Sequence, residues 1–241
     1  MPLHRLDQLL VSRGIGSRKD VSRLIRAGFV RVNGVAVRET ARKIDTSVDT
    51  ITANEQSVLL DTHIVIMLHK PAGVISASRD PKAATVLDLL PAHLRRRGLF
   101  PVGRLDKDTT GLLIITDDGD LAHALLSPKK HVPKTYIATL QTPATPEDAR
   151  AFAAGVTMAA DGHYPQERCE PAELQILPDQ QAQVVLREGK YHQIKRMFAA
   201  RGNQVIALHR IAMGGLHLDM RLLAGDCRLL TEKEIKKLKQ S

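Results

Sequence analysis

The chain of 241 residues has only two cysteines, and they lie far apart at Cys169 and Cys227. They form no Cys-x-x-Cys pair, which argues against a zinc ribbon and against a disulfide framework. The same absence excludes a zinc deaminase acting on nucleobases, because that site needs paired cysteines. We therefore predict no metal site and expect both cysteines to be small buried hydrophobic residues.

Long apolar runs are also missing. No stretch of 18 apolar residues occurs, and residues 1–7 lack the apolar core of a signal peptide. We therefore expect a cytoplasmic protein that does not enter a membrane. No internal repeat or low-complexity tract is visible, and the length allows one good core plus a small appendage.

Aromatic residues are scarce, whereas basic residues are abundant. Three tyrosines, four phenylalanines and no tryptophan make serial stacking on bases an improbable mode of recognition. Thirty-five lysines and arginines against 26 acidic residues give a net charge of +9 and a pI near 9.8. This charge suits a polyanionic partner. If that partner is RNA, its shape should contribute to recognition.

Residues 1–60 form a distinct module in the sequence. Leucines recur at helical spacing until Arg13-Gly14 stops the pattern. A second helix begins after Ser17, which can form a capping box with Asp20, and Gly28 supplies its end. An alternating hairpin follows over residues 29–37. Its centre is Asn-Gly, the pair favoured in a type I′ turn.

Most of the excess positive charge lies in this module. Up to residue 43 it has ten basic residues and three acidic ones, a net charge of +7. The element order and the run Ser-Arg-x-x-x-Ser-Arg-Leu-Ile-x-x-Gly-x-Val-x-Val-Asn-Gly resemble an S4 domain, a small RNA-binding module. A solvated charged helix face is the alternative. The candidate RNA-binding residues are Arg5, Arg18, Lys19, Arg23, Arg26 and Arg31.

The rest of the chain alternates apolar strand-like runs with a few short helices. We expect strands at 63–68, 112–116, 135–140 and 183–186, and helices from Thr145, over 191–200 and from Thr231. This pattern predicts a mixed α+β fold. Residues 54–62 are expected to bridge the two parts, with some docking of their apolar residues.

The stretch 103–111 places Asp106 between basic side chains in a short turn that precedes an apolar strand. It has three interpretations, of which the first is a solvated charged loop. The second is a calcium loop, but position 5 is Thr110, position 12 is Asp117, and no helix pair flanks it. The third is a catalytic acid presented by a rigid strand.

The run Gly-Arg-Leu-Asp-x-Asp-Thr-Thr-Gly-Leu resembles the signature of the pseudouridine synthases of the RsuA type, which isomerise uridines in ribosomal RNA. The resemblance continues at 69–73, 134–136 and 188–198, and it covers nearly the whole chain. The His-Gln-Ile-Lys-Arg-Met-Phe form is most similar to the small-subunit enzyme of the family. The resemblance implies an S4-like domain at 1–60 and a catalytic domain with a mainly antiparallel mixed sheet at 61–241.

The reaction breaks the bond from the sugar to N1, turns the retained uracil and joins its C5 to the same sugar carbon. It needs no cofactor, but it needs an anionic group, a route for the C5 proton and a closed pocket. The resemblance implies that Asp106 is the essential carboxylate, that Lys195 keeps it ionised, with Arg196 as a rival, and that Tyr136 stacks on the uracil. It further implies that Arg104, Gln193 and Arg196 bind substrate.

We expect the target base to leave its helix or loop to reach Asp106. The expected partner is small-subunit ribosomal RNA, within an assembly intermediate, and the protein is expected to act as a monomer. The alternatives are a large-subunit target and a non-catalytic S4 protein associated with the ribosome. A methyltransferase is disfavoured, because Gly14-Ile15-Gly16 has no third glycine and follows a helix.

Overall fold

The computed structural model describes residues 3–46, 48–58, 60, 63–95, 98–127, 130–160, 162 and 164–239. It divides into an N-terminal unit, Met1–Ile64 with Leu90–Leu99, and a C-terminal unit, Val65–Leu89 with Phe100–Ser241. The expected division at residues 60 and 61 assigns Leu90–Leu99 to the catalytic part. The division into domains at 1–60 and 61–241 stays a prediction.

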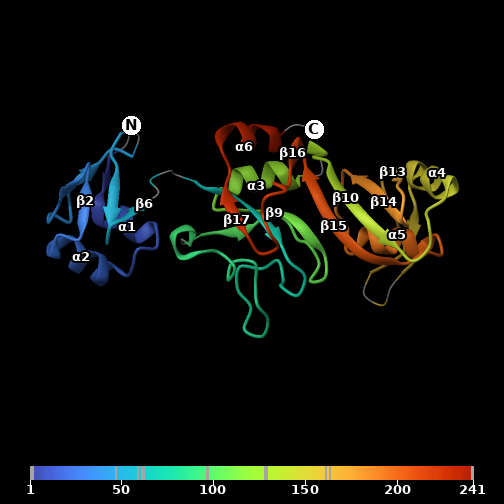
Figure 1. The fold of residues 1–241 in the computed structure, drawn as a ribbon, viewed down its shortest axis with the longest axis horizontal. Coiled ribbons are helices and arrows are strands. Elements are labelled where there is room, and N and C mark those ends of the chain that lie inside the picture. The colour runs from blue at the N-terminus through green and yellow to red at the C-terminus, as the bar shows by residue number, and fades with distance from the viewer. Residues whose placement is uncertain are drawn as a thin grey trace. The chain divides into compact units, whose positions relative to one another are not determined.

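The N-terminal unit combines two helices with short strands (Figure 1). Its elements are β1 His4–Arg5, α1 Leu6–Ser12, α2 Arg18–Ala27, β2 Val30–Val32, β3 Val35–Ala36, β4 Lys43–Ile44, β5 Ile51–Ala53, β6 Gln56–Val58 and the 3-10 helix Ala92–Leu94. An antiparallel sheet has the order β3-β2-β5-β6, and β1 pairs with β4. The core buries apolar residues of both helices, including Leu6 and Ile25, against Val30, Val32 and Ile51 of the sheet.

The local signals of this unit are confirmed. Ser17 caps α2 in a capping box with Asp20, and Gly28 ends the helix in the left-handed region at φ 83°. Asn33 and Gly34 both have positive φ, as a type I′ turn requires. The expected bridge at 54–62 is partly wrong, because Gln56–Val58 form β6 and complete the sheet. Residues 59, 61 and 62 lie outside the described part of the chain.

The C-terminal unit is built around one large sheet of the order β13-β14-β10-β15-β9-β7-β17, to which β16 and β8 add at β15 and β9. Its strands are β7 Val65–Lys70, β8 Phe100–Pro101, β9 Thr110–Thr116, β10 Lys134–Leu140, β13 Glu173–Ile176, β14 Gln181–Leu186, β15 Val205–Met213, β16 Leu216–His217 and β17 Cys227–Leu229. Among the strand pairs that the structure describes in this sheet, β9 and β15 alone are parallel, so the sheet is mainly antiparallel as expected. A separate hairpin pairs β11 Thr157–Met158 with β12 Glu167–Arg168.

Helices cover this sheet in two places (Figure 1). They are α3 Gly119–Leu126, α4 Pro146–Ala154, α5 Gln193–Ala200 and α6 Glu232–Leu238. Leu121 and Leu125 of α3 and Leu238 of α6 pack in one cluster with Met67 and Ile114 of the sheet. This burial anchors β9, which follows the turn containing Asp106, and β7, which pairs with β9.

The helix starts expected at Thr145 and Thr231 are confirmed by capping boxes with Asp148 and Glu234. The helix expected over 191–200 begins later, at Gln193, because His192 has a left-handed backbone with φ 46°. Cys169 is buried as expected, but Cys227 is only half-buried, and both are free thiols. No helix within the described residues is long and apolar enough to span a bilayer.

Candidate active site

A tight turn ahead of β9 presents Asp106. The main-chain N–H of Thr109 donates to the main-chain oxygen of Asp106 at 3.1 Å, and this hydrogen bond closes the turn. Gly111 pairs with Arg210 in the parallel contact between β9 and β15, and its φ is 103°. A Cβ at this position would lie 2.3 Å from the main-chain oxygen of Arg210. Only glycine fits this close approach. The turn is thus seated directly on the centre of the sheet.

Lys70, at the end of β7, supports the turn from inside. Its side chain is fully buried, and its ammonium donates to the main-chain oxygens of Pro71, Asp106, Lys107 and Thr109 at 2.9 to 3.3 Å. Burial lowers the pKa of Lys70 to about 8, while the nearby carboxylates of Asp108 and Asp106 oppose that shift. A lysine 36 residues earlier in the chain therefore holds the backbone that carries Asp106.

Two further contacts fix the turn to the preceding loop. The Ser76 hydroxyl donates to the Leu105 oxygen at 2.8 Å and accepts from the Leu105 N–H at 3.0 Å. The Gly73 N–H donates to the Lys107 oxygen at 2.8 Å. The backbone on both sides of Asp106 is therefore hydrogen-bonded, which limits movement of its carboxylate.

The Asp106 carboxylate meets two cationic or titratable groups. Lys195 Nζ lies 3.2 Å from Oδ2, and His192 Nε2 lies 3.5 Å from Oδ1. Lys195 also donates to Asp108 Oδ1 at 2.6 Å. Its partial burial opposes the charge, yet the contacts to Asp108 and Asp106 raise the pKa of Lys195 above its ordinary value. The hydrogen bond from Lys195 in turn lowers the pKa of Asp108.

Lys195 and Arg196 were both candidates for the cation beside Asp106, and their contacts differ. Arg196 Nη1 lies 3.0 Å from Glu167 Oε1 and its Nη2 donates to the Ala159 oxygen at 2.9 Å, so Arg196 ties the β11–β12 hairpin to α5. Lys195, one residue earlier, faces Asp106. The carboxylates of Asp106 and Asp108 share one ammonium, and within the described residues no group of three acidic, histidine or cysteine side chains could hold a metal ion.

Gln193 lies at the start of α5 and is 4% exposed. Its amide nitrogen donates to Glu188 Oε1 at 2.5 Å, and its amide oxygen accepts from the Lys190 N–H at 2.9 Å. Lys190 continues the network to Glu167 at 3.2 Å. The side chain expected to bind substrate thus uses these contacts to shape the loop that borders the site.

Tyr136 is buried at 8% exposure in β10, where it pairs across the strands with Arg210 of β15. The Arg210 guanidinium lies 6.0 Å from the centre of the Tyr136 ring, and Arg210 Nε donates to the Leu112 oxygen at 2.7 Å. Neighbouring Lys134 also faces this region, and its burial, followed by the charge of Arg210, lowers its pKa. A buried tyrosine ring thus lies beside one buried cation, Arg210, and one half-buried cation, Lys134.

Some of these residues line one cleft of about 840 Å³, whereas Lys195 and Arg196 are not part of its lining. Asp106, Arg104, Tyr136 and Gln193 all border it, together with His192. Sequence reasoning missed His192, Lys134, Arg210, Tyr164 and Tyr191, which also line the cleft. His192 and Tyr191 lay within the recognised block at 188–198, whereas Arg210 had no signal, because a basic residue in an apolar strand is recognisable only from its neighbours. The volume suits a nucleotide.

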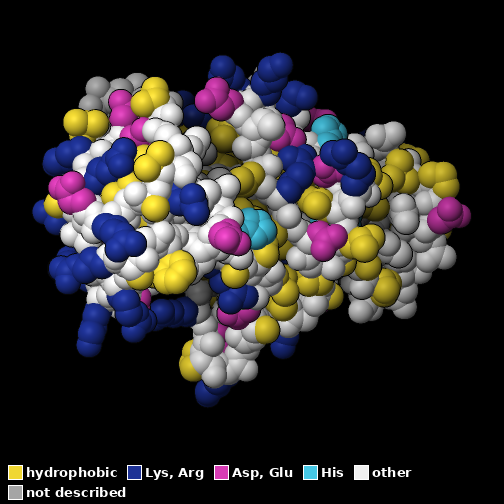
Figure 2. Space-filling model, turned by 60° about the vertical axis from the view of Figure 1, so that its left-hand side comes forward, with side chains coloured by type: hydrophobic (Ala, Val, Ile, Leu, Met, Phe, Trp, Pro, Cys, Tyr) yellow, Lys and Arg dark blue, Asp and Glu magenta, His cyan; other side chains and the backbone are white. Residues whose placement is uncertain are grey.

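The six candidate RNA-binding residues lie in the N-terminal unit. Lys19, Arg23 and Arg26 are exposed on α2, on the side away from the buried Val21 and Ile25. Arg18 is exposed as the first residue of this helix, and Arg31 is exposed on β2. Figure 2 shows Lys and Arg side chains gathered on this unit. Two of the six have acidic partners: Arg5 makes two hydrogen bonds to Asp7, and Arg23 pairs with Asp20 at 3.0 Å. Surface pairs of this kind are weak and leave the cations able to meet phosphates.

Comparison with known proteins identifies both parts of the chain. Residues 64–200 match the RNA pseudouridylate synthase family, and residues 4–49 match the S4 domain. An uncharacterised RNA pseudouridine synthase of Bacillus subtilis (strain 168) is 42% identical over 96% of both chains. The ribosomal small subunit pseudouridine synthase A of Escherichia coli (strain K12) is 40% identical over 96% of this chain and 98% of its own.

A crystal structure of a pseudouridylate synthase superposes with a TM-score of 0.67 at 36% identity, over 97% of this chain and 99% of the other. The resemblance inferred from the four sequence blocks is thereby confirmed, as is the α+β fold with an N-terminal S4 domain. The chain belongs to the RNA pseudouridylate synthase family and is built as an S4 domain followed by a pseudouridine synthase domain.

Proposed function

We propose that this enzyme converts one uridine of small-subunit ribosomal RNA to pseudouridine, with Asp106 as the reacting carboxylate. One observation carries the assignment of Asp106. Its side chain borders a nucleotide-sized cleft, its backbone is anchored by Lys70, and its carboxylate lies 3.2 Å from Lys195. A carboxylate held in a cleft beside a cation has a fixed direction toward a bound substrate.

In the proposed reaction the carboxylate of Asp106 acts on the nucleoside, and the bond between the sugar and N1 breaks. The uracil turns within the closed cleft, and its C5 forms a bond to the same sugar carbon. The C5 proton is then lost and N1 gains a proton, so atoms balance without a redox partner or group donor. Whether the carboxylate first attacks the sugar, attacks the base or takes a sugar proton is a separate question from its identity.

Lys195 has the proposed role of keeping Asp106 charged. The Lys195 ammonium lies 3.2 Å from the Asp106 carboxylate, so it offsets the cost of burying that negative charge when RNA excludes water. Tyr136 supplies a flat ring in the floor of the cleft, on which a uracil can stack. Removal of the C5 proton is a second proposed role for Tyr136. His192, 3.5 Å from Asp106, adds a second contact that orients the carboxylate.

The target base has to leave its helix or loop to reach the cleft. Arg104 is exposed at the cleft border, two residues before Asp106, where it can hold a phosphate or fill the vacated space. The basic face of the S4 domain supplies phosphate contacts elsewhere on the RNA. Gln193 is proposed to act on substrate through the shape of the loop at Glu188 and Lys190.

The small-subunit target rests on relatives named as ribosomal small subunit pseudouridine synthases, which align over nearly their full length. We further propose that the substrate is an assembly intermediate in the cytoplasm and that the protein acts as a monomer. RNA within such a particle is still accessible to a base-flipping enzyme, whereas a finished subunit has packed most of its helices.

Incubation of the purified protein with small-subunit rRNA carrying tritium at C5 of uracil tests the activity. We expect release of tritium to water and one new pseudouridine in the product. Mapping of pseudouridine in small- and large-subunit rRNA from a deletion strain tests the target. Loss of a site in large-subunit rRNA alone would overturn the small-subunit assignment, and release of no tritium from any rRNA would overturn the activity.

A further inference from the structure

Phe29 is the only aromatic residue of the N-terminal unit, and its side chain is 58% exposed. Within the described part of the chain, no other ring and no cation stacks on it. Isolated apolar side chains on a surface are ordinary. Phe29 differs from them because a flat ring lies open to solvent inside the most basic part of the molecule.

The backbone fixes the ring in this position. Gly28 ends α2 with a left-handed backbone, and the Phe29 N–H donates to the Leu24 oxygen at 3.1 Å. The Phe29 oxygen accepts from the Asn54 N–H at 3.0 Å. Val30, the next residue, is buried in the core, so strand alternation turns Phe29 and Arg31 to the outer face. The exposed position of Phe29 is therefore built into the sheet.

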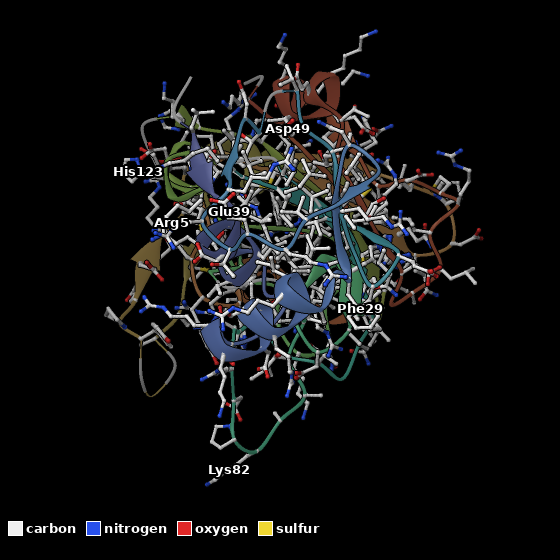
Figure 3. The ribbon with its side chains drawn as sticks, turned by 90° about the vertical axis from the view of Figure 1, so that its left-hand side faces the viewer. Arg5, Phe29, Glu39, Asp49, Lys82 and His123 are labelled. Carbon is white, nitrogen blue, oxygen red and sulfur yellow. The ribbon has the colours of Figure 1, made fainter. Side chains whose placement is uncertain are left out.

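Three arginines lie close to Phe29 along the chain or across the hairpin, namely Arg26, Arg31 and Arg38. Arg31 pairs with Ala36, and the hydrogen bond from Val37 N–H to the Val30 oxygen continues the ladder, which places Arg38 opposite Phe29. The Arg38 guanidinium lies 3.6 Å from the place of a Cβ on Gly28, the residue before Phe29. Arg26 is exposed in the last turn of α2. Figure 3 shows Phe29 beside the end of α2 at the surface of the unit.

We propose that Phe29 stacks on an unpaired base of the RNA while Arg26, Arg31 and Arg38 bind the adjoining phosphates. Phosphate contacts give affinity without regard to base pairing, because every nucleotide carries the same charge. An aromatic face adds a contact that only a splayed-out base can make. The S4 domain would thus select a site where a single-stranded nucleotide lies at a fixed place in the RNA. This inference rests on the proposed action on RNA.

Stacking and phosphate contacts respond differently to salt, and this difference tests the proposal. The RNA is a small-subunit rRNA transcript that the wild-type protein modifies. Replacement Phe29→Ala is expected to weaken binding by roughly 5- to 150-fold, with an unchanged slope of log affinity against log salt. Replacement Arg26→Gln should instead lower that slope by roughly 0.7 to 0.9. The matched control is Val35→Ala on the same hairpin, which is 65% exposed and should bind as wild type.

A second measurement reports the contact directly. The chain contains no tryptophan, so Phe29→Trp introduces a single tryptophan, whose emission can be excited selectively over that of the three tyrosines. Its emission should be quenched by the RNA transcript and by single-stranded oligouridylate, but not by inorganic polyphosphate, which has charge without bases. Val35→Trp should show little quenching by any of the three. The affinity of Phe29→Trp for the transcript should exceed that of Phe29→Ala, since an indole ring also stacks.

The outcomes separate this inference from the proposed function. If the wild-type protein isomerises uridine while Phe29→Ala binds RNA equally well, the stacking contact is wrong and the activity stands. Equal quenching by polyphosphate and RNA would also reject stacking. If the wild-type protein neither binds nor modifies rRNA, both proposals are overturned. Thermal melts of each variant verify folding, which a substitution at a 58% exposed position should preserve.

Discussion

Lys70 Nζ donates a hydrogen bond to the main-chain oxygen of Asp106 at 3.0 Å, so the residue whose carboxylate borders the cleft is held through its backbone by a buried ammonium. Lys70 binds the main-chain oxygen of Asp106, whereas Lys195 lies against its side-chain carboxylate. The carboxylate is free to meet Lys195 and substrate, whereas the carbonyl faces the interior. The carboxylate of Asp106 is thus available for the proposed reaction, while its main-chain oxygen holds the turn in place.

Lys70→Met should damage both stability and turnover. Methionine fills much of the same space, but four main-chain oxygens lose their shared donor. We expect a loss of about 3 kcal/mol in the free energy of unfolding and a fall in single-turnover rate larger than the fall in RNA affinity. Urea unfolding and single-turnover assays measure these effects. The control Lys82→Met, on an exposed loop of the same unit, should change neither. Unchanged turnover in Lys70→Met would show that the turn needs no internal support.

Asp106→Asn should abolish isomerisation while leaving the fold and RNA binding nearly intact. The substitution keeps the shape of the side chain and removes the charge on which every proposed reaction course depends. Asp108→Asn is the matched control, because Asp108 also contacts Lys195 but its side chain is 73% exposed. That variant should keep substantial activity. Single-turnover rates on one RNA give the comparison, and near wild-type turnover by Asp106→Asn would end the assignment of the reacting carboxylate.

Gly111→Ala should destabilise the centre of the C-terminal unit. The added methyl group would meet the Arg210 main-chain oxygen at 2.3 Å and nitrogen at 2.7 Å, and the positive φ of 103° disfavours any side chain. We expect a loss of about 3 kcal/mol or more in the free energy of unfolding, accompanied by loss of turnover. Gly119→Ala, at an exposed position with open space around it, should be neutral. Equal melting temperatures for the two variants would contradict this account of the β9–β15 contact.

The ion pair between Arg228 and Glu234 should make a contribution to the free energy of unfolding that is lost in acid. Hydrogen bonds from Arg228 lower the pKa of Glu234 from 4.5 to about 2. Because the folded state depresses this pKa, the contribution is present above pH 4.5 and is lost as the pH falls from about 4.5 to 2.

Arg228→Met should remove that contribution. Screening at a partly exposed pair reduces it to about 1 kcal/mol. Urea unfolding at pH 7 and at pH 3 should show the difference between Arg228→Met and wild type shrinking at the lower pH. Arg150→Met, which removes the exposed pair with Glu147 on α4, serves as the control and should have a smaller effect. A constant difference across this range would reject the linkage.

Local signals were predictable from the sequence. Capping boxes at Ser17, Thr145 and Thr231 and the Asn33-Gly34 turn depend on neighbours within three or four residues, so the order of residues is enough to specify them. The end of a helix next to the site was less predictable. The left-handed backbone of His192 shortens α5, and it arises where the chain approaches Asp106, far away in sequence.

The sequence by itself determined the family, the S4 domain and the turn that carries Asp106, because those depend on ordered blocks and short-range chemistry. Tertiary structure alone decided which groups surround that carboxylate. Lys70 precedes Asp106 by 36 residues and Arg210 packs on Gly111 from another strand, and both were invisible as partners in the sequence. The physical reason is that a buried charge is stable only where several distant segments supply its hydrogen bonds, and only the folded sheet brings those segments together.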